Sequence, residues 1–253
     1  MKPSVVISIP CYNEEHVLAS SLGRVHAHCT DRLGDYAWTL VIADNASTDR
    51  TPEIGRRLAG ELPGVEYFRS DRKGRGQALR ACWTSIPADV HAYMDSDLAT
   101  ELTFLGPLLD AVRDGADAAI GCRLTAGARV IGRSLSREIS SRGYNRVLKL
   151  FFRVRFRDAQ CGFKAVGRRV LERVVPRTRD DHWFFDSEML ILSERMGFII
   201  REVPVTWEEH MQRDTRVKLF RDISFFIRQV LKLRRRLWFD PETRSAVRCA
   251  REG

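Results

Sequence analysis

The first half of the chain alternates short apolar runs with longer amphipathic stretches. The runs are nearly uninterrupted, which is typical of strands buried on both faces of a sheet. They predict strands at Val5–Ile9, Trp38–Ala43, Val65–Phe68, His91–Met94 and Ala116–Gly121. The stretches between them predict helices over 52–58, 77–85 and 104–112. An earlier helix is predicted to begin at Asn13, whose side chain can cap it, and its apolar stripe consists of Val17, Leu18, Leu22 and Val25.

The second half of the chain has a less regular pattern. It predicts a basic helix over Ser134–Phe152, a polar turn at Arg157–Lys164, a helix over Trp183–Met196 and a strand over Ile199–Trp207. Alternating strands and helices indicate an α/β fold with a mostly parallel sheet flanked by helices. Such sheets bind ligands at the carboxyl ends of their strands.

Acidic residues follow two of the predicted strands. Asp44 ends the second strand, and Asp95 and Asp97 end the fourth. Residues two apart on a strand point to the same side, so Asp95 and Asp97 can converge on one point. Two carboxylates repel each other there unless a cation lies between them, and Mg²⁺ or Mn²⁺ suits such oxygen ligands. The alternatives are a solvated Asp-Ser-Asp turn and, at Asp44–Asp49, a turn with a helix cap.

Composition fits one large domain. The chain has 253 residues, of which 44% are hydrophobic and 30% charged, enough for a substantial core. No apolar run is long enough to span a bilayer, and the N-terminus lacks a signal-peptide pattern, so we expect a cytoplasmic protein. Six scattered cysteines without a C-x-x-C pair predict reduced thiols, not a zinc site or a disulfide framework.

The positive charge is concentrated near the C-terminus. Residues 216–236 hold eight basic residues and one acid, which is +7 of the net charge of +9. Apolar residues recur there every three or four positions: Leu219, Ile223, Phe226, Val230, Leu233 and Leu237. This amphipathic basic helix predicts a contact with an anionic membrane surface. The alternative is that its stripe packs on the rest of the protein.

Six motifs occur in a fixed order: Pro10-Cys11-Tyr12-Asn13-Glu14, Asp44-Asn45-Ala46-Ser47-Thr48-Asp49, Arg72-Lys73-Gly74, Asp95-Ser96-Asp97, Gly121-Cys122-Arg123 and Gln160-Cys161-Gly162-Phe163-Lys164. From residue 4 to 212 the chain resembles the family 2 glycosyltransferases with the GT-A (Rossmann-like) fold. Among them it is most similar to polyprenyl-phosphate (dolichyl-phosphate) hexosyltransferases, and residues 158–164 are similar to the glucosyltransferase branch.

The resemblance implies two groups of residues that bind the donor. A nucleotide-sugar would contact Pro10, Tyr12, Glu14, Asp44, Lys73 and Asp95. Asp95 and Asp97 would hold Mg²⁺ or Mn²⁺ on its diphosphate. The chain departs from the family pattern at Asn45-Ala46-Ser47, where Asp-Gly-Ser is frequent, and at Ala99, where some members have Gln.

The resemblance also implies a site for the acceptor phosphate, at Arg123, Arg137 and Ser141. Arg137 and Ser141 are four residues apart, so they share one helical face, and Arg binds phosphate oxygens bidentately. Asp186 is a further candidate for contacting sugar or acceptor. The implied catalytic residues are therefore Asp97, Asp186 and Arg123.

The expected function is inverting transfer of a hexose, from UDP-glucose or secondly GDP-mannose, to a polyprenyl phosphate. The enzyme would be peripheral on the cytoplasmic face of a membrane, with a homo-oligomer or a small membrane subunit left open. Two alternatives are a glycosyltransferase with a hydroxyl acceptor, which needs a general base at Asp186 or Glu188, and a basic nucleic-acid-binding protein. The second leaves the paired aspartates unexplained, and aromatic stacking platforms are not evident, so no nucleic acid is expected. The predicted parts are a catalytic domain over 1–212, a membrane-interface helix over 213–240 and a flexible tail over 241–253.

Overall fold

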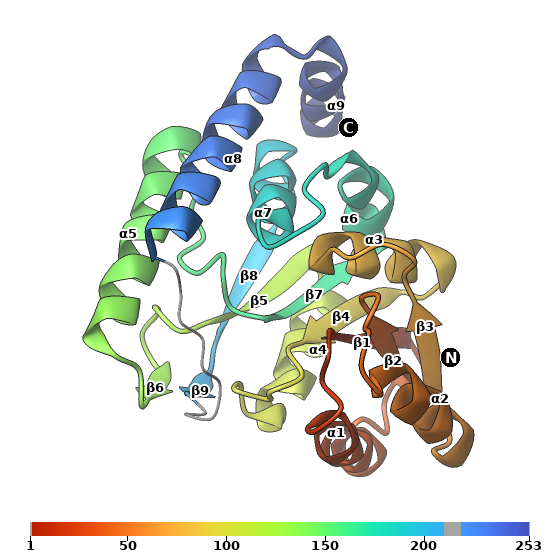
Figure 1. Ribbon diagram of the computed structural model, residues 1–253. Coiled ribbons are helices and arrows are strands. Elements are labelled where there is room, and N and C mark those ends of the chain that lie inside the picture. Colours follow the sequence, from red (N-terminus) through yellow and green to blue (C-terminus); the bar gives the residue numbers. More distant parts are fainter. Residues whose placement is uncertain (1, 210–218, 253) are drawn as a thin grey trace.

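A seven-stranded sheet forms the centre of the computed structural model, which describes residues 2–209 and 219–252 (Figure 1). The strand order is β3-β2-β1-β4-β7-β5-β8. The strands are β1 (Ser4–Cys11), β2 (Ala37–Asp44), β3 (Val65–Arg69), β4 (Val90–Met94), β5 (Ala118–Cys122), β7 (Phe163–Gly167) and β8 (Ile200–Pro204). All neighbours pair in parallel except β7, which is antiparallel to both β4 and β5. The predicted mostly parallel GT-A sheet is confirmed.

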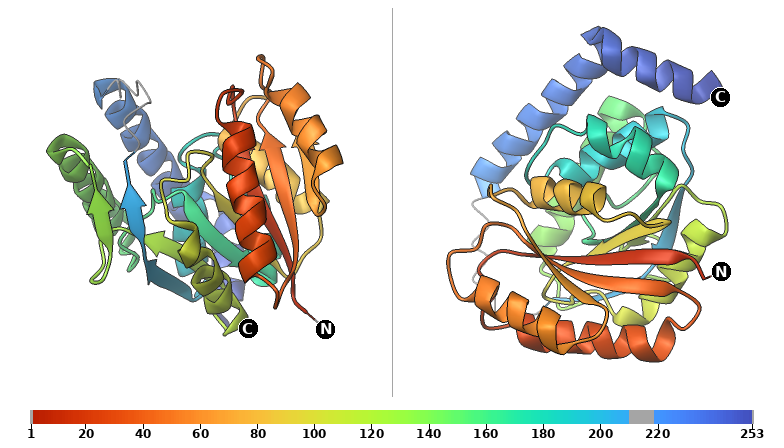
Figure 2. Two further views of the ribbon diagram at one scale, coloured as in Figure 1. Left: turned by 90° about the horizontal axis from the view of Figure 1, so that it is seen from below. Right: turned by 90° about the vertical axis from the view of Figure 1, so that its right-hand side faces the viewer.

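Helices cover both faces of the sheet (Figures 1 and 2). One face carries α1 (Leu18–Arg32), α2 (Thr51–Glu61) and α4 (Leu105–Arg113). The other carries α3 (Arg75–Ser85), α5 (Leu135–Phe152), α6 (Arg168–Arg173), α7 (Phe185–Arg195) and α8 (Leu219–Phe239). The remaining elements are the 3-10 turns η1 (Leu102–Phe104) and η2 (Val175–Arg177), a small sheet of β6 (Arg129–Ile131) with β9 (Thr206–Glu208), and α9 (Pro241–Glu252).

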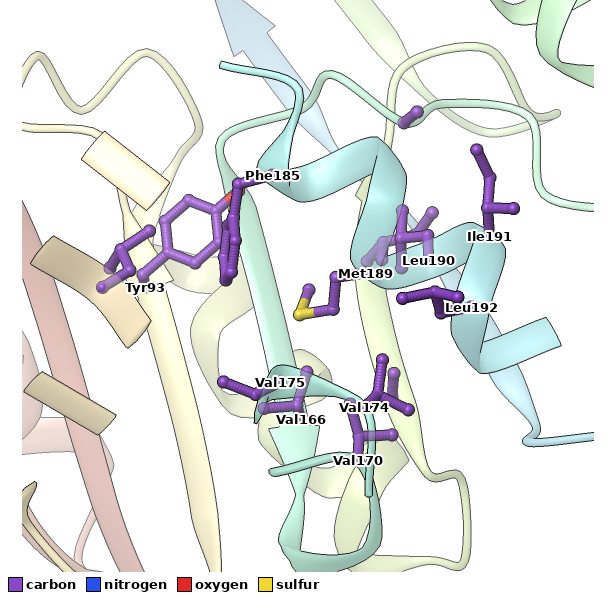
Figure 3. Close-up of a cluster of buried hydrophobic side chains, with 14 of the residues drawn as sticks. Tyr93, Val166, Val170, Val174, Val175, Phe185, Met189, Leu190, Ile191 and Leu192 are labelled. Atoms are coloured by element: carbon purple, nitrogen blue, oxygen red, sulfur yellow. The ribbon is translucent and has the colours of Figure 1, made fainter. Parts of the chain in front are cut away.

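The central strands are apolar on both sides because each side packs under helices. Val6 and Ile120 belong to the core cluster under α7, whereas Ile7 and Ala119 belong to the cluster under α1 and α4. Figure 3 shows α7 over β7, with Phe185 beside Tyr93 of β4. Burying such side chains contributes about 1.5–3 kcal/mol each relative to exposure, which fixes the sheet on which the site is built.

Several local predictions differ from the structure. The first helix begins at Leu18, and the prediction that Asn13 caps it is wrong, because Asn13 has a φ of 55° and its side chain binds Thr48. The predicted strand over 199–207 is two strands, β8 and β9, in different sheets. The segment after the polar turn forms β7, which the sequence pattern did not reveal.

The C-terminal region contains two helices. Helix α8 matches the predicted amphipathic helix from Leu219 onward, and residues 213–218 of that prediction lie outside the described residues. The segment predicted to be a flexible tail contains α9. Among the described residues, no helix is both long and apolar enough to cross a bilayer. Five cysteines are free and buried, as predicted for thiols: Cys11, Cys29, Cys82, Cys122 and Cys161.

Candidate functional site

A cavity of about 570 Å³ opens at the carboxyl ends of β1 and β4. Its walls come from the loops after β1, β2 and β4, from the start of α5, and from the segments before α7 and after β8. Three of these loops contain a non-glycine residue with positive φ: Asn13, Ala46 and Leu98. This backbone conformation costs about 1–2 kcal/mol per residue, so packing and hydrogen bonds must hold the loops in place.

The wall formed by the loop after β1 contains the predicted nucleotide residues Pro10, Tyr12 and Glu14. The Lys73 ammonium lies 3.7 Å from the centroid of the Tyr12 ring. This cation–π contact brings Lys73 to the edge of the cavity, although Lys73 does not itself line it. With Asp95, which also lines the cavity, the structure brings together five of the six residues predicted to contact the nucleotide.

Asp44 does not reach this cavity. Its carboxylate is fully buried and accepts hydrogen bonds from the Tyr67 hydroxyl at 2.6 Å, Arg69 Nη1 at 2.8 Å and the Ser47 amide at 2.9 Å. Asn45 lines the cavity instead. Asp44 thus shapes the turn that presents Asn45, and its predicted direct contact with nucleotide does not match this geometry.

Asp95 and Asp97, the two residues predicted to hold a metal ion, both line the cavity. The Asp95 side chain is 39% exposed, and its amide donates to the Gly162 carbonyl at 3.0 Å. Asp97 Oδ1 accepts from the Ala99 amide at 3.2 Å. Two carboxylates open to the same cavity are hard oxygen donors that fit Mg²⁺ or Mn²⁺ when a ligand supplies further oxygens. In the described part of the chain, no third His, Cys, Asp or Glu completes a protein-only metal cluster.

Arg75 is a central cavity residue that the sequence analysis did not single out. Its guanidinium is 8% exposed, and it contacts Asp95 Oδ1 and Asp186 Oδ2, each at 2.7 Å. The rings of Tyr93 and Trp183 lie 4.8 and 5.0 Å from its central carbon.

The two glycines that flank Arg75 were the available sequence signal. A β-carbon on Gly74 would lie 2.5 Å from the Asp181 carbonyl oxygen, and one on Gly76 would overlap Phe185. Only glycine allows the start of α3 to approach residues 181–185 so closely. That approach places Arg75 beside Asp186.

Asp186 lies behind Arg75 and does not line the cavity. It is 5% exposed, accepts a hydrogen bond from the Tyr93 hydroxyl, and lies 3.6 Å from the fully buried ammonium of Lys164. Burial alone would raise the pKa of Asp186, but Lys164 and Arg75 hold it below its usual value. The predicted direct contact of Asp186 with sugar or acceptor does not match this position.

The other side of the cavity contains Arg137 from the first turn of α5, together with Trp207 and Glu209. Arg137 forms an ion pair with Glu209. Ser141 lies one turn further along α5, but it is 4% exposed, and its hydroxyl has no hydrogen-bond partner among the residues that the structure describes. Of the predicted acceptor pair, only Arg137 lines the cavity.

Arg123 also lies outside the lining. Its Nε and Nη2 donate to the two Asp158 carboxylate oxygens at 2.8 and 2.9 Å. Burial would raise the pKa of Asp158, yet Arg123 lowers it below the usual value. The guanidinium lies 5.4 Å from the centroid of the Trp207 ring, which does line the cavity. Arg123 is thus placed to support Trp207 rather than to face the cavity.

Comparison with known protein families shows to which family the chain belongs. Residues 6–175 match the model of the family described as glycosyl transferase family 2. The chain belongs to this family.

Curated relatives narrow the group of proteins to which the chain is similar. It is 37% identical over 245 residues to glycosyltransferase AglD of Haloferax volcanii, covering 96% of this chain and 38% of AglD. It is 28% identical to the dolichyl-phosphate beta-glucosyltransferase of Saccharomyces cerevisiae, covering 80% and 66% of the two chains. It is 30% identical to the polyprenol monophosphomannose synthase of Mycolicibacterium smegmatis, covering 81% and 77%. The chain thus spans less than two-thirds of the length of the first two.

Solved structures share the fold. Glucosyl-3-phosphoglycerate synthase from Mycobacterium tuberculosis, in complex with Mn²⁺, UDP and glucosyl-3-phosphoglycerate, superimposes with a TM-score of 0.64 at 20% identity. The superposition covers 91% of this chain and 78% of that one. At this identity the likeness concerns the fold alone.

Proposed function

We propose that this chain transfers a hexose, with inversion, from a nucleotide-diphosphate sugar to a polyprenyl phosphate. UDP-glucose is the first candidate donor and GDP-mannose the second. The observation that carries the proposal is that Asp95 and Asp97 in one wall and Arg137 in another line the same cavity. The names of the relatives in Saccharomyces and Mycolicibacterium support the acceptor class.

A phosphate acceptor does not require an acidic side chain that acts as a general base. A phosphate monoester is already anionic near neutral pH, so it needs no general base, and catalysis rests on positioning and electrostatics. Its oxygen would attack the anomeric carbon while the bond to the diphosphate breaks on the opposite side. The products would be a glycosylated lipid phosphate and a nucleoside diphosphate.

The alternative with a hydroxyl acceptor loses both of its proposed bases. Asp186 is held by Arg75, Lys164 and Tyr93. Glu188 is 3% exposed, and it pairs with Arg236 at 2.7 Å while accepting from two backbone amides. Neither carboxylate lines the cavity, so neither can take a proton from a bound hydroxyl. This difference favours the phosphate acceptor.

Each wall of the cavity would have its own task. Pro10, Tyr12, Glu14 and Asn45 would bind the nucleotide, with Lys73 at the edge. Asp95 and Asp97 would hold Mg²⁺ or Mn²⁺, which when bound neutralises charge on the leaving diphosphate. Arg137 would bind the acceptor phosphate by charge-assisted hydrogen bonds, and Arg123, paired with Asp158, would support Trp207 in the cavity wall.

A lipid acceptor requires access to a bilayer, and the outer faces of α5 and α8 fit that role. The two helices run side by side in the same direction, with Tyr144 against Phe226 and Phe151 against Arg234 (Figure 2). The inner side of α8 packs on the core through Val230 and Leu233, so the predicted packing alternative holds for that side.

The outward sides carry exposed apolar residues interspersed with cations. The apolar residues are Leu135, Ile139 and Leu150 of α5 and Ile227, Leu231 and Trp238 of α8. The exposed cations include Arg142, Arg146, Arg228 and Lys232. Leu135 directly follows Ser134, which lines the cavity, so a lipid entering at this end of α5 has a short path to Arg137. We infer peripheral attachment on the cytoplasmic face through these two helices.

The test is a donor screen with a short-chain polyprenyl phosphate, with and without Mg²⁺ or Mn²⁺, read by product mass. We expect that one nucleotide-sugar in the screen yields a polyprenyl phosphate that carries a hexose. Asp95→Asn and Asp97→Asn should each cut turnover by orders of magnitude with the fold intact by circular dichroism. Near wild-type turnover of both variants in the presence of a chelator would contradict the metal assignment, and transfer only to hydroxyl acceptors would contradict the acceptor.

A further inference from the structure

Four charged side chains form a closed cluster beneath the metal-binding wall of the cavity. Arg75 bridges Asp95 and Asp186, and Lys164 lies on the far side of Asp186. Lys164 is fully buried and donates to the Tyr93 hydroxyl at 3.1 Å and to the Cys161 carbonyl. The cluster holds two carboxylates and two cations, so it is neutral without any metal ion.

Arg75 cannot easily move away from Asp95. Its Nη1 is fixed by Asp186 at 2.7 Å, and the rings of Tyr93 and Trp183 contact the guanidinium. Asp186 is itself fixed by Lys164 and Tyr93. A chain of buried contacts therefore positions one positive charge against a predicted metal ligand. A guanidinium is not deprotonated in proteins, so this positive charge is permanent.

This arrangement has a direct consequence for binding. A divalent cation at Asp95 would lie within a few ångströms of the guanidinium, and at such distances like charges in a partly buried site repel strongly. The negative charge of a nucleoside diphosphate would compensate both cations at once. The donor and the metal ion therefore each need the other.

We propose that Arg75, positioned by Asp186, is a built-in counter-ion of Asp95 that makes metal binding depend on the diphosphate of the donor. The metal ion binds weakly to the free protein and tightly together with nucleotide, so the site stays closed to metal until donor arrives. This inference rests on the proposed function and deepens it, because it adds a binding order to the same cavity.

The test measures binding only. Mn²⁺ affinity is followed by the electron paramagnetic resonance signal of free Mn²⁺, without nucleotide and with UDP or GDP in excess. For the wild-type chain we expect at least about a tenfold tighter Mn²⁺ affinity with the nucleotide that binds. By linkage, Mn²⁺ should strengthen nucleotide binding by the same factor in calorimetry.

Variants at Arg75 separate this role from a merely structural one. Arg75→Gln should bind Mn²⁺ without nucleotide at least about tenfold more tightly than wild type, and the coupling should shrink accordingly. Arg75→Lys keeps the charge and should retain most of the coupling. Arg57→Gln removes an equal charge from an exposed ion pair with Glu61 on α2 and should match wild type.

Each outcome decides a specific point. Equal Mn²⁺ affinity of the wild-type chain with and without bound nucleotide overturns the counter-ion role, whatever the variants do. The same holds if Arg75→Gln folds and its Mn²⁺ affinity without nucleotide is unchanged. A chain that binds neither nucleotide in the presence of Mn²⁺ overturns the proposed function, and this inference with it.

Discussion

Gly162 faces Asp95 so closely that a β-carbon at position 162 would overlap the Asp95 carboxylate. The Gly162 carbonyl also accepts the Asp95 amide, so backbone and side chain of Asp95 are both set by this glycine. The glycine of the Gln160-Cys161-Gly162 motif thus acts through a metal-ligand candidate 67 residues earlier in the chain.

We predict that Gly162→Ala displaces the Asp95 carboxylate and lowers transfer at least about tenfold, with a matching loss of Mn²⁺ affinity in the presence of nucleotide. Gly143→Ala is the control, because a β-carbon there meets nothing within 4 Å. Kinetics and Mn²⁺ titration measure the two effects. Unchanged values for both in a folded Gly162→Ala variant would show that the carboxylate position is not set by this glycine.

Arg137 is expected to act on the acceptor. Arg137→Ala removes charge-assisted hydrogen bonds to phosphate, which are worth about 1.5–3 kcal/mol, so kcat/KM for the lipid acceptor should fall by about 10- to 150-fold. Nucleotide affinity by calorimetry should change little. Arg57→Ala, at an exposed ion pair with Glu61 on α2, is the control for lost charge. Equal losses of donor and acceptor binding would remove Arg137 from the acceptor side.

Membrane attachment is expected to depend on both outer helix faces. The double variants Leu135→Ser/Ile139→Ser and Ile227→Ser/Leu231→Ser should each reduce flotation with anionic liposomes at low salt, since each removes exposed apolar contact area. Point variants are preferable to deleting α8, because deletion would uncover the core under Val230 and Leu233. Ile199→Ser, at a similarly exposed residue just before β8, is the control.

Two outcomes of the liposome experiment would contradict the proposed membrane-binding surface. Wild-type protein that does not float with anionic liposomes at low salt refutes the surface as a whole. Variants that float as well as wild type, with transfer to a short-chain acceptor intact, place the membrane contact elsewhere while leaving the proposed reaction untouched.

The strained turn at Ala46 leads to a stability prediction. Ala46 has a φ of 57°, a conformation that costs an L-residue about 1–2 kcal/mol but costs glycine nothing. Glycine also makes the unfolded chain more flexible, at a cost of about 0.4–1 kcal/mol. Ala46→Gly should therefore leave the free energy of unfolding unchanged or raise it by up to about 1.6 kcal/mol. Ala59→Gly, inside α2, should lower it by about 1 kcal/mol or slightly less. Equal destabilisation by both in urea titrations would refute the strain.

The pair of Asp158 and Arg123 predicts a loss of stability in acid. The pKa of Asp158 is lower in the folded than in the unfolded chain, so between these two pKa values the unfolded chain binds more protons. The contribution of ionised Asp158 to the free energy of unfolding is complete above about pH 4, which is the ordinary carboxyl pKa. It is lost as the pH falls through the lower pKa of the folded chain.

Urea unfolding from pH 7 to pH 3 measures this contribution. Wild type should lose more free energy of unfolding below about pH 4 than Asp158→Asn does. At neutral pH the variant should be less stable by about 3–5 kcal/mol, because it leaves Arg123 buried without its partner. Parallel curves for the two proteins would contradict the assignment.

The sequence was sufficient for those parts of the fold that depend on local pattern. The parallel strands were predictable because apolar runs such as Val5–Ile9 and Trp38–Ala43 signal burial on both faces. Strand β7 was not, because it follows a polar motif and contains Lys164, whose burial depends on Tyr93 and Asp186. The charge partners of a buried lysine are not visible in a linear pattern.

The same distinction applies to the site. Asp95, Asp97 and Arg137 line one cavity; the two aspartates could be singled out from the end of a predicted strand, which is a local feature, and Arg137 from the resemblance to the family. Asp44 and Asp186 were expected to face ligand, but other side chains hold them. Asp44 is bound by Tyr67, 23 residues later in the chain, and Asp186 by Arg75, 111 residues earlier. Arg75 was overlooked for the same reason.

The antiparallel strand β7 also governs how the molecule can be assembled. β5 pairs only with β7 and β8, and β4 pairs only with β1 and β7, among the described strands. During synthesis, β1 to β4 can form a sheet by themselves, but β5 must wait for β7, some forty residues later, before it can join them. Completion of the sheet thus depends on contacts between residues far apart in the sequence, and such contacts form slowly. A nascent chain that ends before β7 leaves the β7 side of β4 without its partner strand, and such an edge can pair with another chain.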